Sequence, residues 1–228
     1  MTKSSIYLTA SDGHQFNAFI AEPKVEPVAD LVLLQEIFGV TAHMQKLAVD
    51  FASYGFRVTV PALFDRVERD LVVSYKDADR GRGIAQQCEV ASVLRDIDAA
   101  CKYTGDSRPV AVIGYCWGGT FAYLAAAKLE VAAAVSYYGT RVADNLQAQL
   151  NAPVQFHIGA DDGMIPEPAI TKIMQAHPNQ PLWIYDNAGH AFACQDRATY
   201  EPISSELAKQ RTLDFLARQL ALTIQPSH

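Results

Sequence analysis

The sequence lacks the features that mark membrane, secreted and disulfide-stabilised proteins. No apolar run approaches the ~20 residues that a membrane helix needs, and the first five residues lack the apolar core of a signal peptide. We therefore expect a cytoplasmic protein that makes no contact with a membrane. Only four of the 228 residues are cysteines, and none of them forms a C-x-x-C pair. Neither a zinc site nor a disulfide framework is predicted.

Basic residues are also in the minority. Lysine and arginine number 19 against 25 aspartates and glutamates, which gives a formal net charge of −6. This balance argues against nucleic acid as a partner, since a binding protein of that kind normally shows a basic face. It does not exclude an anionic small substrate, because one or two well-placed arginines are enough to bind a carboxylate.

What the sequence does contain is a regular alternation of short apolar runs and helix patterns. Half of the residues are apolar and 19% are charged, and we find no repeat, low-complexity tract or linker. We therefore predict a single domain over 1–228 of the α/β class, a mostly parallel sheet covered by helices on both faces. Two strands joined by an Asp-Gly turn are expected within 6–21. Further strands are expected at 31–34, 56–60, 110–113, 131–137, 154–158 and 182–185, and helices near 44–51, 84–103, 117–128 and 204–220. The stretch 65–83 is polar and is expected to be irregular.

In sheets of this type ligands bind beyond the carboxyl ends of the strands, and one such junction is Gly114-Tyr115-Cys116-Trp117-Gly118-Gly119. Its position between a strand and a helix is typical of the nucleophile elbow G-x-S-x-G, here with cysteine for serine. The start of the following helix stabilises a thiolate, and the Trp117 N–H is a natural oxyanion donor. The alternative is a tight glycine turn with a structural cysteine.

An acid and a base follow in the order that such a triad requires. Asp161 and Asp162 come after the strand expected at 154–158, and His190 comes after the strand expected at 182–185. His190 would take or hold the thiol proton, and one of the two aspartates would orient its ring. The other aspartate, or both, can equally be a helix cap or a solvated turn residue.

At this point the sequence resembles the dienelactone hydrolase family of α/β-hydrolases. The resemblance covers nearly the whole chain, and its most specific motifs are Gln35-Glu36-Ile37-Phe38-Gly39 and the Gly-Tyr-Cys of the elbow. The other matching segments are 137–139, 156–162, 189–192 and 211–216. The family opens cyclic enol-lactones that carry a carboxylate, of the dienelactone to maleylacetate type, in the bacterial breakdown of chlorinated aromatics.

The resemblance implies a role for each matching residue. Cys116 corresponds to the nucleophile, His190 to the base, and Asp162 rather than Asp161 to the acid. Glu36 matches a glutamate that interacts with the thiol in the resting enzyme, and the Ile37 N–H matches the second oxyanion donor beside Trp117. A monomer is expected that acts through an acyl-enzyme on a small ester or lactone, with no metal and no organic cofactor.

The sequence departs from the family in its substrate-binding residues. Where the family has an arginine four residues after the histidine, this chain has Cys194. We expect Arg197 to replace that arginine, and Arg82, or else Arg80, to match a second family arginine; a solvated charge is the alternative for all three. Two aromatic residues, Phe38 and Tyr138, are expected to line the pocket together with Trp117, or else to belong to the core.

Three other functions compete with lactone hydrolysis. The first is a carboxylesterase or thioesterase that uses the same chemistry on another small substrate, which the Cys194 departure leaves open. The second is a non-catalytic sensor in which Cys116 is an oxidisable thiol. The third is a plain binding domain, whose Cys116 would react like any free cysteine.

Overall fold

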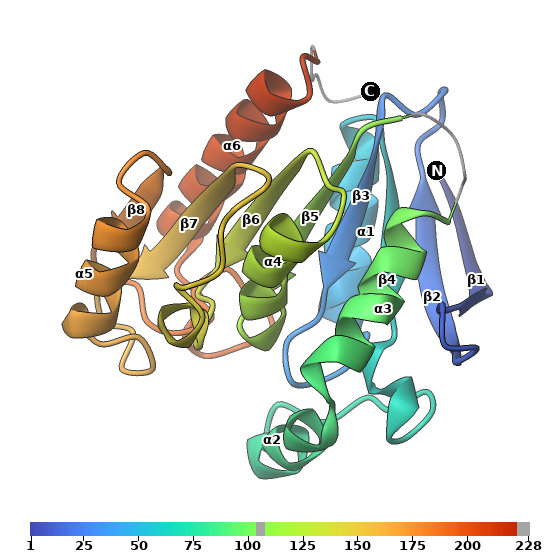
Figure 1. Cartoon of the computed structure of the whole chain (residues 1–228), viewed down its shortest axis with the longest axis horizontal. Coiled ribbons are helices and arrows are strands. Elements are labelled where there is room, and N and C mark those ends of the chain that lie inside the picture. The colour runs from blue at the N-terminus through green and yellow to red at the C-terminus, as the bar shows by residue number, and fades with distance from the viewer. Residues whose placement is uncertain (104–107, 223–228) are drawn as a thin grey trace.

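The computed structural model describes residues 1–103 and 108–222, which form one twisted eight-stranded sheet with helices on both faces (Figure 1). The strands β3 to β8 run parallel to one another, and β1 and β2 are added antiparallel at one edge. In order across the sheet, the strands are β1 (Thr2–Thr9), β2 (Gln15–Glu22), β4 (Phe56–Pro61), β3 (Ala29–Leu34), β5 (Val110–Tyr115), β6 (Ala133–Tyr137), β7 (Val154–Gly159) and β8 (Leu182–Tyr185).

The helices cover the two faces of the sheet. Figure 1 shows α3 (Val90–Cys101), α4 (Trp117–Lys128) and α5 (Glu167–Ala176) on the near face, and α1 (Ala42–Ser53) and α6 (Pro202–Gln219) on the far face. The remaining helices are α2 (Ala78–Gln87) and two short 3-10 turns, η1 (Leu63–Arg66) and η2 (Val142–Asp144). This architecture confirms the predicted fold class. Among the described residues, no helix combines the length and the apolar character of a membrane span.

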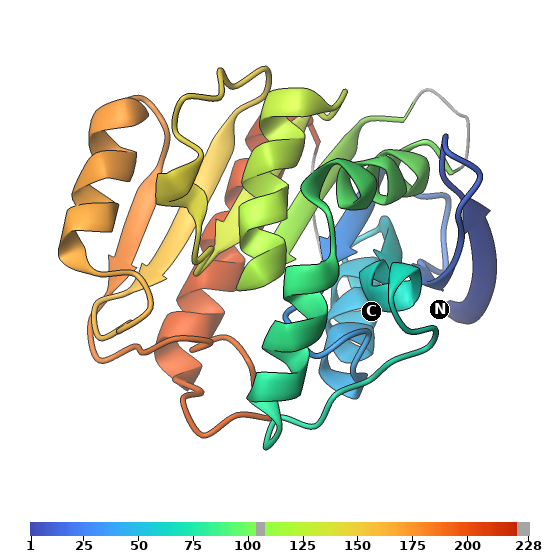
Figure 2. The same cartoon turned by 60° about the horizontal axis from the view of Figure 1, so that its bottom comes forward.

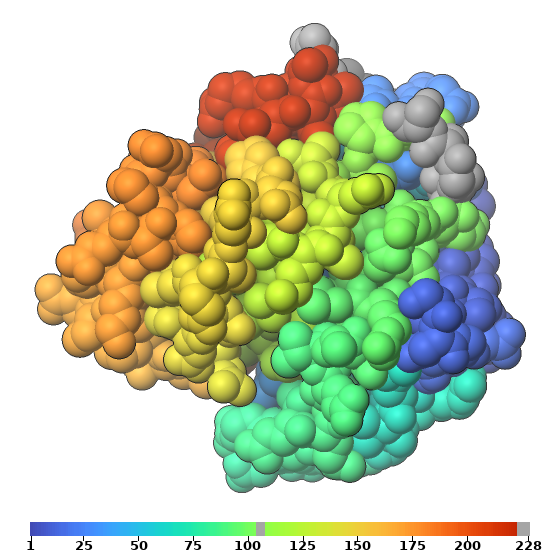
Figure 3. Space-filling model, in the orientation of Figure 1, coloured from blue at the N-terminus to red at the C-terminus, as the bar shows by residue number. Residues whose placement is uncertain are grey.

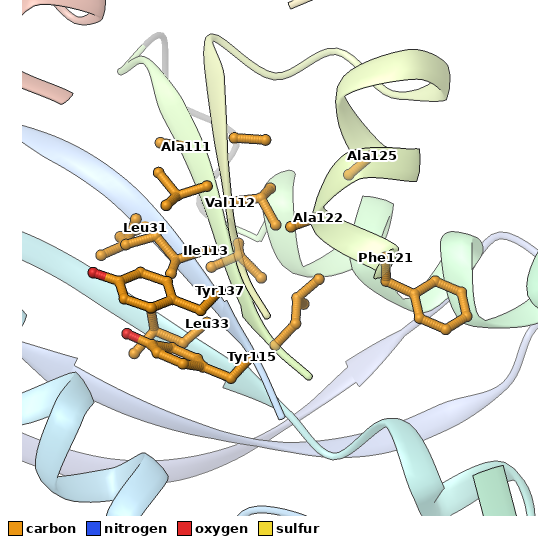
Figure 4. Close-up of a cluster of buried hydrophobic side chains, with 14 of the residues drawn as sticks. Leu31, Leu33, Ala111, Val112, Ile113, Tyr115, Phe121, Ala122, Ala125 and Tyr137 are labelled. Carbon is orange, nitrogen blue, oxygen red and sulfur yellow. The ribbon is translucent and has the colours of Figure 1, made fainter. Parts of the chain in front are cut away.

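The core lies on both sides of the central strands, because these strands are apolar on both faces. All six residues of β3 are buried. Figure 4 shows Ala122 and Ala125 of α4 on the Val112 side of β5, with Tyr115 and Tyr137 on the other side. An unbroken apolar strand is therefore explained by helices packing on each face.

The prediction of one helix over 84–103 is wrong, because this range is divided between two helices, α2 and α3. Cys88 and Glu89 adopt extended backbone angles between α2 and α3, although nothing in their sequence predicts a break. The prediction of an irregular stretch at 65–83 is also wrong in part, because α2 begins within it at Ala78. Asp77 caps α2 by accepting a hydrogen bond from the Arg80 N–H. The predicted domain, 1–228, also includes 104–107 and 223–228, which lie outside the described residues.

The carboxyl ends of the parallel strands meet at the lower edge of the sheet in Figure 1, and α2 lies beyond this edge. Figure 2 brings the edge forward and shows α2 in front of it. The loops that leave β3, β5, β7 and β8 at this edge carry Glu36, Cys116, Asp162 and His190. The topology thus gathers residues that are far apart in the sequence.

Candidate active site

Cys116 occupies a strained turn between β5 and α4. Its backbone has φ 53° and ψ −116°, a conformation that a non-glycine residue adopts only where the surroundings enforce it. The Cys116 N–H donates to the Tyr137 carbonyl at 2.9 Å, and the Gly118 N–H donates to the Gln35 carbonyl at 3.1 Å. A Cβ at Gly118 would lie 2.5 Å from that same carbonyl oxygen. Glycine is therefore needed there for the elbow to approach the end of β3.

The structure brings Cys116, His190 and Asp162 into one hydrogen-bonded line. His190 Nε2 lies 3.1 Å from Cys116 Sγ, and His190 Nδ1 lies 2.8 Å from Asp162 Oδ2. The other carboxylate oxygen of Asp162 accepts from the Met164 N–H at 2.9 Å. Asp162 is buried, whereas Asp161 is exposed. The acid beside the histidine is therefore Asp162.

His190 is set to hold a proton. Burial lowers its pKa, but the hydrogen bonds and charges of Asp162 and Cys116 outweigh burial and raise the pKa to about 10. The two partners act in the same direction, because both a carboxylate and a thiolate favour the imidazolium form. Both neighbours therefore favour the protonated form of His190.

Glu36 lies near His190 in a dry environment. Its residue exposure is 3%, and its Oε1 has no hydrogen-bond partner in the described part of the chain. Glu36 pairs with Arg197, whose Nη1 lies 3.7 Å from Oε1. Burial raises the pKa of Glu36, although Arg197 and His190 favour its charged form. A carboxyl group in this state can exchange a proton with its neighbours.

Two backbone N–H groups in the loops after β3 and β5 are candidates for binding an oxyanion. Ile37 follows Glu36 directly, and Trp117 is the first residue of α4. Among residues 1–103 and 108–222, neither of these N–H groups donates to a protein acceptor. Unpaired donors beside a nucleophile are what an oxyanion hole requires.

The three candidate arginines are placed differently. Arg197 lies over the ring of Phe38, 5.5 Å from its centroid, and next to Glu36. Arg80 lies on the surface, where it pairs with Glu68 at 2.8 Å. Arg82 is half-exposed and pairs with Asp79. Of the three, only Arg197 is in contact with other predicted site residues in the described structure.

The predicted pocket aromatics are all tightly packed. Tyr138 is fully buried, and its ring edge contacts His190 with a centroid distance of 5.2 Å. The Tyr138 hydroxyl has no hydrogen-bond partner among the described residues. Phe38 is buried beneath Arg197, and Trp117 contacts the Phe64 ring. Tyr138 therefore fixes one side of the histidine.

Tyr75 was not predicted as a site residue. Its hydroxyl lies 3.2 Å from Thr41 Oγ1 and 3.6 Å from Cys194 Sγ, and its ring meets the edge of Phe38. Cys194 thus contacts a neutral hydroxyl group from a segment 119 residues away. No local motif marks Tyr75, because its position depends on how the segment before α2 folds back.

No three histidine, cysteine, aspartate or glutamate side chains of the described segments are grouped so that they could hold a metal ion. All four cysteines are free, and Cys194 is buried like Cys116. The reactive side chains that the structure brings to this edge of the sheet include the Cys116 thiol, the His190 imidazole and the carboxyl groups of Asp162 and Glu36.

The chain is similar over most of its length to proteins of one family. The model of the dienelactone hydrolase family matches residues 16–220. A carboxymethylenebutenolidase from Pseudomonas putida is 31% identical over 229 residues, which cover 95% of this chain and 97% of that one. A Bradyrhizobium protein, named provisionally as a 2-oxo-3-(5-oxofuran-2-ylidene)propanoate lactonase, is 30% identical over 227 residues and 90% of each chain. A solved structure from Klebsiella pneumoniae, named provisionally as a dienelactone hydrolase, has a TM-score of 0.81 at 27% identity and covers 94% of this chain and 99% of that one.

Proposed function

The chain belongs to the dienelactone hydrolase family of α/β-hydrolases, and we propose that it opens a small carboxylate-bearing enol-lactone through Cys116, His190 and Asp162. The coarser conclusion, hydrolysis of a carboxylic ester or lactone, follows from the family and its relatives. The proposal that these three residues catalyse the reaction is supported by one observation. His190 Nε2 lies 3.1 Å from Cys116 Sγ, and His190 Nδ1 lies 2.8 Å from Asp162 Oδ2.

In the first half of the reaction, the Cys116 thiolate adds to the lactone carbonyl carbon. The carbonyl electrons move onto oxygen, and the N–H groups of Ile37 and Trp117 bind this oxyanion. As the tetrahedral intermediate collapses, the ring C–O bond breaks. The leaving enolate oxygen takes the proton of His190, and a thioester remains on Cys116.

In the second half, water attacks the thioester and His190 takes the proton from that water. Acylation prepares His190 for this step. The thioester sulfur no longer carries the negative charge that helps to raise the pKa of His190, so the neutral imidazole becomes easier to form. When the C–S bond breaks, the sulfur leaves as the thiolate and the imidazolium form of His190 is restored beside it.

A substrate carboxylate fits the environment of Arg197. Its guanidinium contacts Glu36 only at 3.7 Å, and burial raises the pKa of Glu36 and so favours a neutral partner. The positive charge of Arg197 is therefore available for an anionic group. The Bradyrhizobium relative is itself named for a lactone that carries a propanoate group.

The second candidate is an esterase or thioesterase that acts on a neutral small substrate. It is favoured by Cys194, which contacts the Tyr75 hydroxyl at the position where the resemblance leads us to expect an arginine. A site with one arginine is expected to prefer a carboxylate-bearing substrate less strongly than a site with two arginines.

The nucleophile is tested with an activated ester, p-nitrophenyl acetate. We expect Cys116→Ala to abolish turnover and Cys101→Ala to retain it, because Cys101 lies in α3 and is not part of the triad. Circular dichroism checks that both variants fold. Comparable loss of activity in the two folded variants would show that Cys116 is not the nucleophile.

The substrate class is tested by comparing a carboxylate-bearing enol-lactone with its methyl ester. We expect the acid to be preferred, and Arg197→Gln to reduce that preference roughly 10- to 100-fold, as expected for a lost hydrogen bond to a charged group. Arg218→Gln, at an exposed position of α6, is the matched control and should leave the preference unchanged. Equal rates for acid and ester in the wild-type protein would favour the neutral-substrate esterase. A loss of preference in Arg82→Gln instead would assign the carboxylate to Arg82.

A further inference from the structure

The loop that carries Ile37 is clamped by a distant segment, residues 71–81, which we call the strap. The strap meets the loop through backbone atoms at three places. The Val73 N–H donates to the Phe38 carbonyl at 2.9 Å. A Cβ at Gly39 would overlap the Leu71 carbonyl oxygen, and a Cβ at Gly81 would overlap the Ile37 carbonyl oxygen. Main chain thus packs directly on main chain.

Two side chains of the strap, Leu71 and Val73, form a small buried hydrophobic cluster with Phe38 and Phe64. The side chains of Ile37 and Trp117 pack against this cluster. The same cluster therefore supports both residues whose N–H groups are the oxyanion donors. In Figures 1 and 3 the strap and α2 form the lower end of the molecule, beyond the strand ends.

Of these three contacts, the one made by Gly81 lies closest to the proposed oxyanion donor, the Ile37 N–H, because it involves the carbonyl of the same residue. The Ile37 carbonyl that it touches is separated from the Ile37 N–H only by the Cα atom, so a shift of the carbonyl moves the N–H as well. We propose that Gly81 is a positioning residue, which lets α2 rest on the Ile37 main chain and hold its N–H toward the reacting carbonyl. The inference rests on the proposed function, because it assigns the Ile37 N–H to the oxyanion.

The chain offers a matched control two residues along the same helix. A Cβ at Gly83 would meet nothing within 4 Å. Gly81→Ala and Gly83→Ala therefore add the same methyl group and the same helix propensity to α2. They differ in whether that methyl group pushes on Ile37.

The test measures two reactions of Cys116 in each variant. Hydrolysis of p-nitrophenyl acetate passes through an oxyanion, whereas alkylation by iodoacetamide does not and reports on the thiolate and His190 alone. We expect Gly81→Ala to lower kcat about 10- to 100-fold, somewhat less than the loss of a whole oxyanion donor. We expect its KM and its alkylation rate to stay within about twofold of wild type, as a donor used only in the transition state requires. Gly83→Ala should leave all three unchanged.

Two outcomes would overturn the proposal: a kcat of Gly81→Ala within twofold of that of Gly83→Ala, or a parallel fall in its alkylation rate. If Gly81→Ala does not fold, Leu71→Ala loosens the strap without adding bulk. It should lower kcat and leave alkylation unchanged, and an unchanged kcat there would equally overturn the proposal. Failure of the proposed function looks different, because Cys116→Ala would then turn over the ester as fast as wild type.

Discussion

His190 is held at both ring nitrogens, so its proton affinity depends on two neighbours at once. The Asp162 carboxylate lies on the Nδ1 side and the Cys116 sulfur on the Nε2 side. Tyr138 packs its ring edge on the imidazole and keeps water from that side. Both neighbours favour the protonated form of His190. In the mechanism that we propose, acylation of Cys116 would remove one of these two influences on the pKa of His190.

This dependence can be measured directly by NMR titration of the His190 ring. We expect a pKa of about 10 in the wild-type protein, and a pKa shifted toward 6.5 in Asp162→Asn and in Cys116→Ala, because each variant removes one negative partner. Glu167→Gln, an exposed carboxylate in the first turn of α5, is the control and should not move it. A wild-type pKa near 6.5 would contradict the ion-pair description of the site.

At the scale of single residues, the sequence predicts the site residues that lie in the loops after strands. Cys116, His190 and the pair Asp161 and Asp162 are predicted because the end of a parallel strand places the following loop at a known edge of the sheet. The choice of Asp162 over Asp161 comes from the family resemblance. Tyr75 and its contact with Cys194 were not found. The contact between Tyr75 and Cys194 depends on long-range packing, which no local pattern records.

At the scale of elements, most strands and helices agree with the predicted ranges. The exceptions are α5, for which no range is predicted, and the single helix expected over 84–103, which is divided between α2 and α3. The stretch 65–83 is expected to be irregular because it is polar, and it contains Gly81, a residue type with a low helix propensity. The structure shows that Gly81 is required by the close contact of α2 with Ile37. A local preference is overridden there by a tertiary contact, and the contact lies beside the site.

The helix α6 is joined to the sheet by a buried polar contact at Thr212. Its hydroxyl lies 2.7 Å from the Tyr137 hydroxyl and 3.0 Å from His157 Nε2. We expect Thr212→Val to lower the free energy of unfolding by about 1–3 kcal/mol, because two buried polar groups lose a partner while the volume is kept. Urea unfolding measures the change. The same substitution at Thr171, exposed on α5, should stay within about 0.5 kcal/mol of wild type. Equal effects at the two positions would show that the contact does not stabilise the docking of α6.

At the scale of the whole molecule, the net charge of −6 is a poor guide to the site. The surface cations Arg80, Arg82 and Arg141 are each paired with a neighbouring carboxylate. Arg197 is the cation that contacts Glu36, which is nearly dry. The local field at the strand ends is therefore set by a few buried groups, whereas the sum over the surface governs solubility and encounter.

The same buried groups predict how stability varies with pH. Burial lowers the pKa of His43 to about 4 and that of His157 to about 3. Their neutral forms favour the fold above pH 6.5, and this stability is lost as the pH falls below that value, because the unfolded chain binds protons that the folded chain does not. His190 acts in the opposite sense. Its stabilisation is fully present below pH 6.5 and is lost as the pH rises toward 10.

These three histidines therefore predict a maximum of the unfolding free energy near pH 6.5, with a decline on both sides. We expect His43→Gln to flatten the acid side between pH 6.5 and 4 by up to about 1.4 kcal/mol per pH unit, and His190→Gln to flatten the alkaline side similarly. Urea unfolding at half-unit pH intervals gives the slopes, and comparing slopes removes the loss of packing that each substitution causes at every pH. Thr171→Val, which removes no titratable group from the exposed face of α5, is the control and should leave both slopes unchanged. If His190→Gln altered the acid slope and His43→Gln the alkaline slope, the assignment of the two limbs would be wrong.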